Sequence, residues 1–131
     1  MLLQLSVHNY AIVDHLDLEL KPGMSTITGE TGAGKSIMLD ALSLTLGARA
    51  DSGVVRPGAD KADILSSFDI SQIPEAGNWL KERDLDNDGQ CLLRRVITAE
   101  GRSRGYINGT PCTQADLRQL GELLIDIHSQ H

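Results

Sequence analysis

One eight-residue segment combines glycines, a lysine and a serine in a spacing that can hold phosphate groups. Residues 29–36 read Gly-Glu-Thr-Gly-Ala-Gly-Lys-Ser, which fits the phosphate-loop pattern G-x-x-x-x-G-K-[ST]. The glycines let the backbone curl so that successive N–H groups point at phosphate oxygens, and the N-terminus of the helix that follows favours negative charge. Lys35 can then reach the β- and γ-phosphates, and the hydroxyl of Ser36 can ligate Mg²⁺. We therefore expect a nucleotide-phosphate site formed by Gly29, Glu30, Thr31, Gly32, Ala33, Gly34, Lys35 and Ser36.

A nucleotide hydrolase also needs an acidic residue that holds Mg²⁺, typically an Asp at the end of an apolar strand. The partial candidate is Asp126, which follows the apolar run 123–125. Position 127 is Ile, so no acidic general base comes directly after it. Two interpretations stay open: Asp126 is a magnesium-site residue, or it is one polar position in a buried strand.

The segments around the phosphate loop predict the elements that position it. Period-two alternation predicts two antiparallel strands within 2–20, and β-branched residues predict a third strand over 24–28. A largely apolar helix is expected over 35–47, with Gly47 at its C-terminal end. Residues 48–63 carry loop signals. The remaining expectations are strands over 62–70, 91–97, 104–107 and 122–128, helices over 75–83 and 114–121, a hairpin turn at Asn108-Gly109 and a helix cap at Thr113.

The stretch from residue 62 to residue 112 therefore consists mostly of strands and tight turns. Such a stretch suggests an antiparallel β layer beside the phosphate loop. A small complete P-loop enzyme alternates strands and helices to build a parallel sheet. We therefore expect the chain to be half of a nucleotide-binding domain.

Composition excludes several other classes. The chain has 131 residues, of which 40% are hydrophobic, so it can bury a core. Its 12 Lys and Arg against 18 Asp and Glu argue against an autonomous nucleic-acid module. The sequence contains no run of about 18 apolar residues that would predict a membrane span, and no secretory signal is visible. Cys91 and Cys112 predict reduced thiols in a cytoplasmic protein, and the four histidines show no metal-ligand spacing on a helix.

Several segments together resemble the ABC-type ATPase heads of the SMC and RecF/RecN class. More narrowly, the chain resembles the N-terminal segment of the bacterial DNA repair members of that class, and the resemblance covers essentially all of it. The segments are the opening strand with Asn9-Tyr10, the phosphate loop, 46–51, 55–58 and the ending 126–131. One departure is Ser129, where many relatives carry Gly.

The resemblance implies an α/β P-loop NTPase fold in which residues 1–131 are the N-terminal part of an ABC-type head. The rest of the head and a long coiled coil would lie outside this chain. ATP and Mg²⁺ are the implied cofactors, with Ser36 and Gln130 as metal contacts and Gln130 also near the attacking water. Asp126 would then lie on the strand that enters the Q-loop. Implied partners are the C-terminal half of the same head, a second head joined through ATP, and DNA, with no membrane and a cytoplasmic, nucleoid-associated location.

Other residues keep two interpretations each. Asn9 and Tyr10 either pack near the adenine or serve the turn and core, and Arg56 either contacts phosphate or DNA or is a solvated loop arginine. Trp79 is expected to anchor a small apolar cluster. Four arginines either form a basic edge that touches DNA or lie on a solvated charged face. They are Arg94, Arg95, Arg102 and Arg104.

Three functions follow from these observations. The first is the ATP-binding half of an ATPase in DNA double-strand break repair and recombination, whose hydrolysis needs the missing half. The second is a free-standing small P-loop NTPase or kinase that uses Asp126 for magnesium. The third is a nucleotide-dependent interaction module without catalysis.

Overall fold

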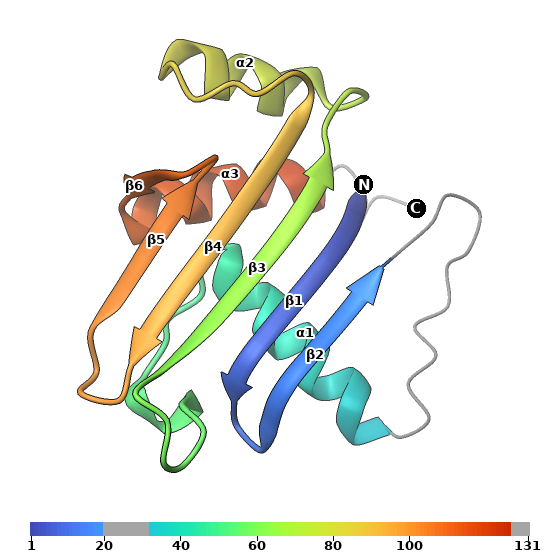
Figure 1. Ribbon diagram of the computed structural model, residues 1–131. Helices are drawn as coiled ribbons and strands as arrows, with labels where there is room; N and C mark the ends of the chain where they lie inside the picture. Colours follow the sequence, from blue (N-terminus) through green and yellow to red (C-terminus); the bar gives the residue numbers. More distant parts are fainter. Residues whose placement is uncertain (20–31, 127–131) are drawn as a thin grey trace.

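The chain forms one antiparallel sheet with helices on one side (Figure 1). The computed structural model describes residues 1–19 and 32–126, without the side chains of residues 32–35 and 126. The described elements follow one another along the chain as β1 (Leu2–Tyr10), β2 (Val13–Glu19), α1 (Gly32–Thr45), the short 3₁₀ helix η1 (Ser52–Val54), β3 (Lys61–Asp69), α2 (Pro74–Glu82), β4 (Gln90–Thr98), β5 (Ser103–Ile107), β6 (Thr110–Cys112) and α3 (Gln114–Asp126).

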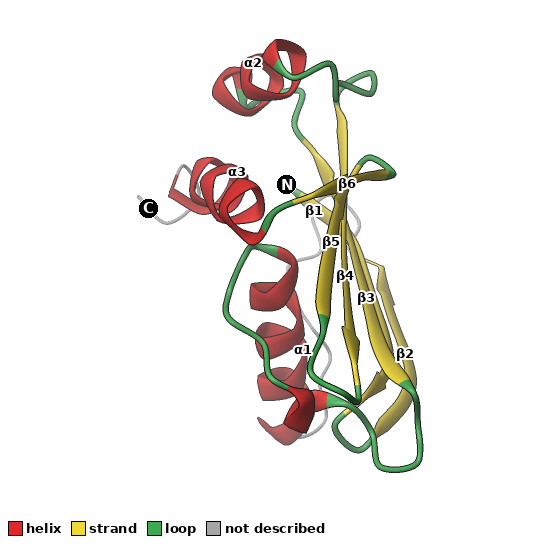
Figure 2. Ribbon diagram, turned by 90° about the vertical axis from the view of Figure 1, so that its left-hand side faces the viewer, coloured by secondary structure: helices red, strands yellow, loops and turns green. Residues whose placement is uncertain are grey.

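The sheet has the strand order β2-β1-β3-β4-β5-β6, and every neighbouring pair is antiparallel. Figure 2 shows α1 and α3 on the same face of this sheet, with α2 beyond one end of it. None of the elements that the structure describes covers the opposite face (Figure 2). The sheet therefore presents one packed face and one open face, as antiparallel sheets commonly do.

Strand alternation decides which side chains face the helices. Along β3, Ala62, Ile64, Ser66 and Phe68 are buried, whereas the positions between them are half-buried. Successive side chains of a strand point to opposite faces, so the buried set lies on the helix side. Two apolar clusters result, one under α1 and one under α3.

Most expected elements are confirmed. The two N-terminal strands pair as a hairpin, and Asn108-Gly109 joins β5 to β6 with positive φ at both positions. The expected helix over 35–47 begins earlier, at Gly32, and the expected strand over 24–28 lies outside the described residues. Both cysteines are free, and burial raises the pKa of Cys91 to about 12.

The expected strand over 122–128 is wrong within the described residues. Residues 122–126 continue α3, whose buried Leu117, Leu120 and Leu124 recur at helical spacing and pack against the sheet. A short apolar run such as 123–125 suits a buried strand and a buried helix equally. None of the described helices is long and apolar enough to cross a membrane.

Candidate nucleotide-binding site

The phosphate-loop sequence leads directly into α1. Residues 29–31 lie outside the described part, whereas residues 32–36 form the first turn and a half of the helix. The first four N–H groups of an α-helix have no partner inside the helix, and its dipole places positive potential there. The side chain of Ser36 is exposed at this end. A helix start with a solvent-accessible hydroxyl fits a phosphate with its Mg²⁺, since hydroxyl oxygen is a ligand that Mg²⁺ accepts.

The core holds α1 firmly against the sheet. Met38, Ala41 and Leu44 are buried and pack on the strand residues Val7 and Ile64, among others. Thr45 adds a buried polar contact, because Ser66 on β3 donates a 2.8 Å hydrogen bond to its hydroxyl. The helix that carries the phosphate-loop residues is therefore held against the sheet by its inner face, while its outer face is exposed to solvent.

The C-terminal end of α1 is fixed by a buried arginine. Arg95 on β4 is 2% exposed, and its Nη1 donates to the carbonyl oxygens of Leu44 at 2.7 Å and Ala48 at 2.9 Å. Its Nε donates to the hydroxyl of Ser103 at 2.7 Å. Helix C-termini carry unsatisfied carbonyls and negative potential, so a cation is stabilising there.

Asn9 and Arg56, the two further candidates for nucleotide contact, lie side by side. The Arg56 backbone N–H donates to the Asn9 carbonyl at 2.8 Å, and an isolated bridge pairs Tyr10 with Val55. The Arg56 guanidinium lies 3.6 Å from Asp14, and both side chains are solvent-exposed. An exposed pair at that distance is weak, so the guanidinium remains free to contact another anion.

These residues share one end of the sheet with the start of α1. Figure 1 shows the β1–β2 turn, η1 and the first turn of α1 at the same lower end, and Figure 2 agrees. Asn9 has a φ of 54°, so it bends the chain at this turn. Tyr10 is buried in the cluster under α1, and burial raises its pKa, with the negative charges of Asp40 and Asp51 adding to the effect. Tyr10 therefore serves the core, which confirms that part of the expectation.

The four further arginines do not form one basic edge. Arg95 is buried on the helix side, so it cannot reach DNA. Arg94 lies on the open face, where its Nε and Nη2 donate to the two carboxylate oxygens of Asp63 at 2.9 and 2.6 Å. Arg102 and Arg104 are exposed near the β4–β5 turn. Arg95 is therefore excluded from both interpretations because adjacent strand residues point to opposite faces, whereas both stay open for Arg94, Arg102 and Arg104.

The acidic residue considered for Mg²⁺ binding lies in a helix. Asp126 is the last residue of α3, so the strand that was expected to present it is not formed at residues 122–126. Its side chain, Gln130 and the two C-terminal histidines, His128 and His131, lie outside the described residues. Trp79 packs against the cluster under α3 and donates a 3.2 Å hydrogen bond to Gln119, which confirms its anchoring role.

Two functional features escaped the sequence. One is the contact of Arg95 with the C-terminal end of α1. The alternation along β4 was the available signal, because it marks residue 95 as inward-facing. The other is a polar group on the open face, where His8 on β1 lies directly opposite His15 on β2. The signal for this pair was the β1–β2 turn: once Tyr10 is paired with Val13, the register brings the histidines together.

Comparison with known proteins defines the class. The chain belongs to the AAA domain family, whose model matches residues 4–110. Its fold is similar to that of a solved structure described as "Structural biochemistry of ATP-driven dimerization and DNA stimulated activation of SMC ATPases", at 18% identity and a TM-score of 0.75, over 95% of this chain and 79% of that one. A structure of the recombination mediator protein RecF with ATP aligns at 17% identity and a TM-score of 0.63, over 94% and 29% of the two chains. The expected α/β fold of an ABC-type ATPase head is confirmed.

The chain is also similar in sequence to a particular DNA repair protein. Over its whole length, the chain is 50% identical to the DNA repair protein RecN of Vibrio cholerae serotype O1. It spans 24% of the length of that relative. The resemblance that the sequence motifs indicated is therefore confirmed.

Proposed function

We propose that this chain is the ATP-binding part of a RecN-like ATPase of the SMC class, which acts in DNA double-strand break repair and recombination. The observation that carries the proposal is the phosphate-loop sequence of residues 29–36 leading into helix α1, whose inner face packs on the sheet. The similarity to RecN along the whole chain supports the role in repair.

In this proposal each phosphate-loop residue has a defined task. Backbone N–H groups of residues 29–34 surround the β-phosphate, Lys35 balances the charge of the β- and γ-phosphates, and Ser36 ligates Mg²⁺. Arg56 and Asn9, at the same end of the sheet as Ser36, contact the nucleotide from the side. Gln130 contacts Mg²⁺ or the attacking water. Because α1 is locked by its core and by Arg95, the phosphate site is preorganised.

Hydrolysis belongs to a larger assembly in this proposal. The RecN relative is about four times as long as this chain, so other parts of such a protein supply the acidic catalytic residues. ATP then joins two heads, the C-terminal half of each head completes its own site, and head engagement is transmitted to DNA. The partners are therefore the rest of the same head, a second head and DNA.

The test is calorimetric titration of Mg-ATP into the chain and into Lys35→Ala. We expect binding heat without sustained hydrolysis in the parent, and a loss of affinity of about 100-fold or more in the variant, because a charge-assisted phosphate contact is among the strongest in such a site. Lys81→Ala is the matched control, since Lys81 is an exposed lysine on α2 and its removal leaves binding unchanged.

Two results contradict the proposal. Sustained turnover that is lost in both Lys35→Ala and Asp126→Asn identifies a free-standing P-loop NTPase or kinase instead. Equal affinity of the parent and Lys35→Ala shows that residues 29–36 do not bind the nucleotide.

A further inference from the structure

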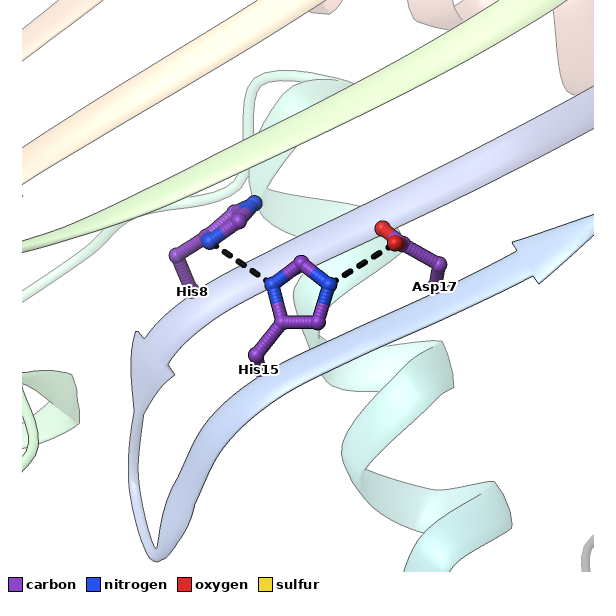
Figure 3. Close-up of polar contacts among 3 residues, drawn as sticks. All are labelled: His8, His15 and Asp17. Carbon is purple, nitrogen blue, oxygen red and sulfur yellow. Dashed lines mark hydrogen bonds and ion pairs between the residues drawn. The ribbon is translucent and has the colours of Figure 1, made fainter.

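Three polar side chains gather on the open face of the sheet, where the first hairpin presents them together (Figure 3). His8 on β1 is paired directly with His15 on β2, and Asp17 follows two residues later on the same face of β2. Val7 and Leu16, which alternate with them, belong to the cluster under α1. The group therefore lies on the opposite side of the sheet from the helix that carries the phosphate-loop residues.

The contacts within this group run in a chain. Nδ1 of His8 lies 3.0 Å from Nδ1 of His15, and Nε2 of His15 lies 2.8 Å from a carboxylate oxygen of Asp17. The two imidazole rings meet edge to face, with centroids 4.3 Å apart. One donor atom from each of the three side chains lies within 4.8 Å of the others.

The carboxylate decides which nitrogen of His15 carries a proton. A carboxylate accepts hydrogen bonds, and an oxygen of Asp17 lies 2.8 Å from Nε2 of His15. In the tautomer of His15 whose Nε2–H donates to Asp17, the lone pair of Nδ1 is directed at His8. The proton between the two Nδ1 atoms comes from His8, and its loss would leave two lone pairs facing one another.

We propose that His8 and His15 bind a divalent transition-metal ion of the Zn²⁺ type between their Nδ1 atoms, with Asp17 as the positioning residue. Two nitrogens bound to one tetrahedral Zn²⁺ at about 2.0–2.1 Å lie roughly 3.3 Å apart, so their present separation needs only a small adjustment. A carboxylate that accepts from the other ring nitrogen is the usual support of a metal-binding histidine. Water completes the coordination, because the side chains of His15 and Asp17 are 52% and 48% exposed.

The donor set separates this site from the proposed ATP site. Imidazole nitrogens suit Zn²⁺, Cu²⁺ and Ni²⁺, whereas Mg²⁺ prefers oxygen ligands. The cysteines are weak competitors for the metal, since burial raises the pKa of Cys91 to about 12 and that of Cys112 to about 11. A bound ion would join β1 to the edge strand β2. The inference does not depend on the proposed function.

The first test is calorimetric titration of ZnCl₂ into the metal-free chain with millimolar Mg²⁺ present. We expect one ion per chain with a dissociation constant of about 1–10 µM, because a site with only two protein ligands and an open face binds more weakly than a closed one. His8→Gln and His15→Gln should each weaken binding at least about tenfold, and Asp17→Asn by about 10- to 100-fold. The matched control is the double variant His128→Gln/His131→Gln, which removes the chain's other two histidines and should leave binding unchanged.

The second test needs no substitution. Long-range ¹H–¹⁵N spectra of the histidine rings should show Zn²⁺ shifting Nδ1 of His8 and His15, while Mg²⁺ shifts neither. The proposal is overturned if Zn²⁺ at about 100 µM leaves these signals in place, or if affinity survives His8→Gln or His15→Gln but falls in the control.

Discussion

At the scale of single residues, two adjacent arginines show how strand alternation gives different roles to two side chains of the same type. Arg94 lies on the open face, held by Asp63 and placed 5.5 Å from the ring centre of Tyr106. Arg95 lies under the helices and donates to the carbonyls of Leu44, in the last turn of α1, and of Ala48, just beyond it. The side chain of Arg94 is 43% exposed, whereas that of Arg95 is buried and serves two carbonyl groups.

This contrast predicts unequal costs for the same substitution. Arg95→Met should lower the free energy of unfolding by about 2 kcal/mol or more, because the carbonyls of Leu44 and Ala48 each lose a hydrogen bond from a charged donor. Arg94→Met, the matched control, should cost less, about 1 kcal/mol, because the Arg94 side chain is 43% exposed and its ion pair with Asp63 is partly screened by solvent. Urea unfolding of both variants measures the difference. Equal costs would show that Arg95 does not serve as the cap of α1.

At the scale of elements, α1 ends where α3 passes closest to it. Gly47 has a φ of 97°, its N–H donates to Leu44 O, and Ala48 N–H donates to Ser43 O, which together form a Schellman motif. A Cβ on Gly47 would lie 2.5 Å from the backbone nitrogen of Arg118 on α3. The end of the candidate nucleotide-binding helix is therefore defined by a turn and by a close contact with α3.

The two requirements at Gly47 can be separated experimentally. Gly101, in the β4–β5 turn, has the same φ of 97° and nothing within 4 Å of an added Cβ. Gly101→Ala should therefore cost about 1–2 kcal/mol for the left-handed backbone alone. Gly47→Ala should cost about 1–3 kcal/mol more, because α3 must shift. Thermal and urea unfolding of the pair measure the excess, and similar costs would contradict a tight α1–α3 contact.

Local chemistry explains which elements the sequence predicts correctly. The hairpin at Asn108-Gly109 needs positive φ at both positions, and Thr113 caps α3 by accepting from the N–H of Asp116 at 3.0 Å. Both signals act within a few residues. Gly47 is similar, since its position after an apolar run predicts the end of the helix.

The sequence fails where partners distant along the chain decide the outcome. The apolar pattern of residues 122–126 is compatible with either a strand or a helix. Only the packing of Leu120 and Leu124 on the sheet selects the helix. The burial of Arg95 depends on the end of α1, because its guanidinium donates to Leu44, 51 residues earlier, and to Ala48, 47 residues earlier. The His8–His15 pair depends on the strand register, which composition does not reveal. The phosphate loop is recognised because its residues are consecutive.

At the scale of the whole molecule, the exposed sheet edges are poor sites for self-association. The edge strand β2 carries Asp14, Asp17 and Glu19, and charged side chains oppose pairing with another strand. The other edge, β6, has three residues, one of which is Pro111. Both described edges therefore argue against self-association through a sheet edge.

The helix side offers a more apolar contact surface. Leu39 on α1 is 52% exposed and Ile125 on α3 is 45% exposed, although both helices pack their other faces on the sheet. Under the proposed function, another part of the head covers this side. In the isolated chain, the same surface is available to a second copy.

A comparison of Leu39→Gln with a substitution of the buried neighbouring residue Met38 tests this surface. The substitution should change the free energy of unfolding by less than about 0.5 kcal/mol, because the side chain is half exposed, and it should reduce concentration-dependent association in sedimentation velocity. Met38→Gln, one position earlier and 4% exposed, should instead cost about 2–4 kcal/mol, because it buries an amide in the core beneath α1. If Leu39→Gln unfolds the chain as Met38→Gln does, the outer side of α1 is already packed. If association is unchanged while stability is kept, the contact between copies lies elsewhere, and the sheet edges become the next surface to test.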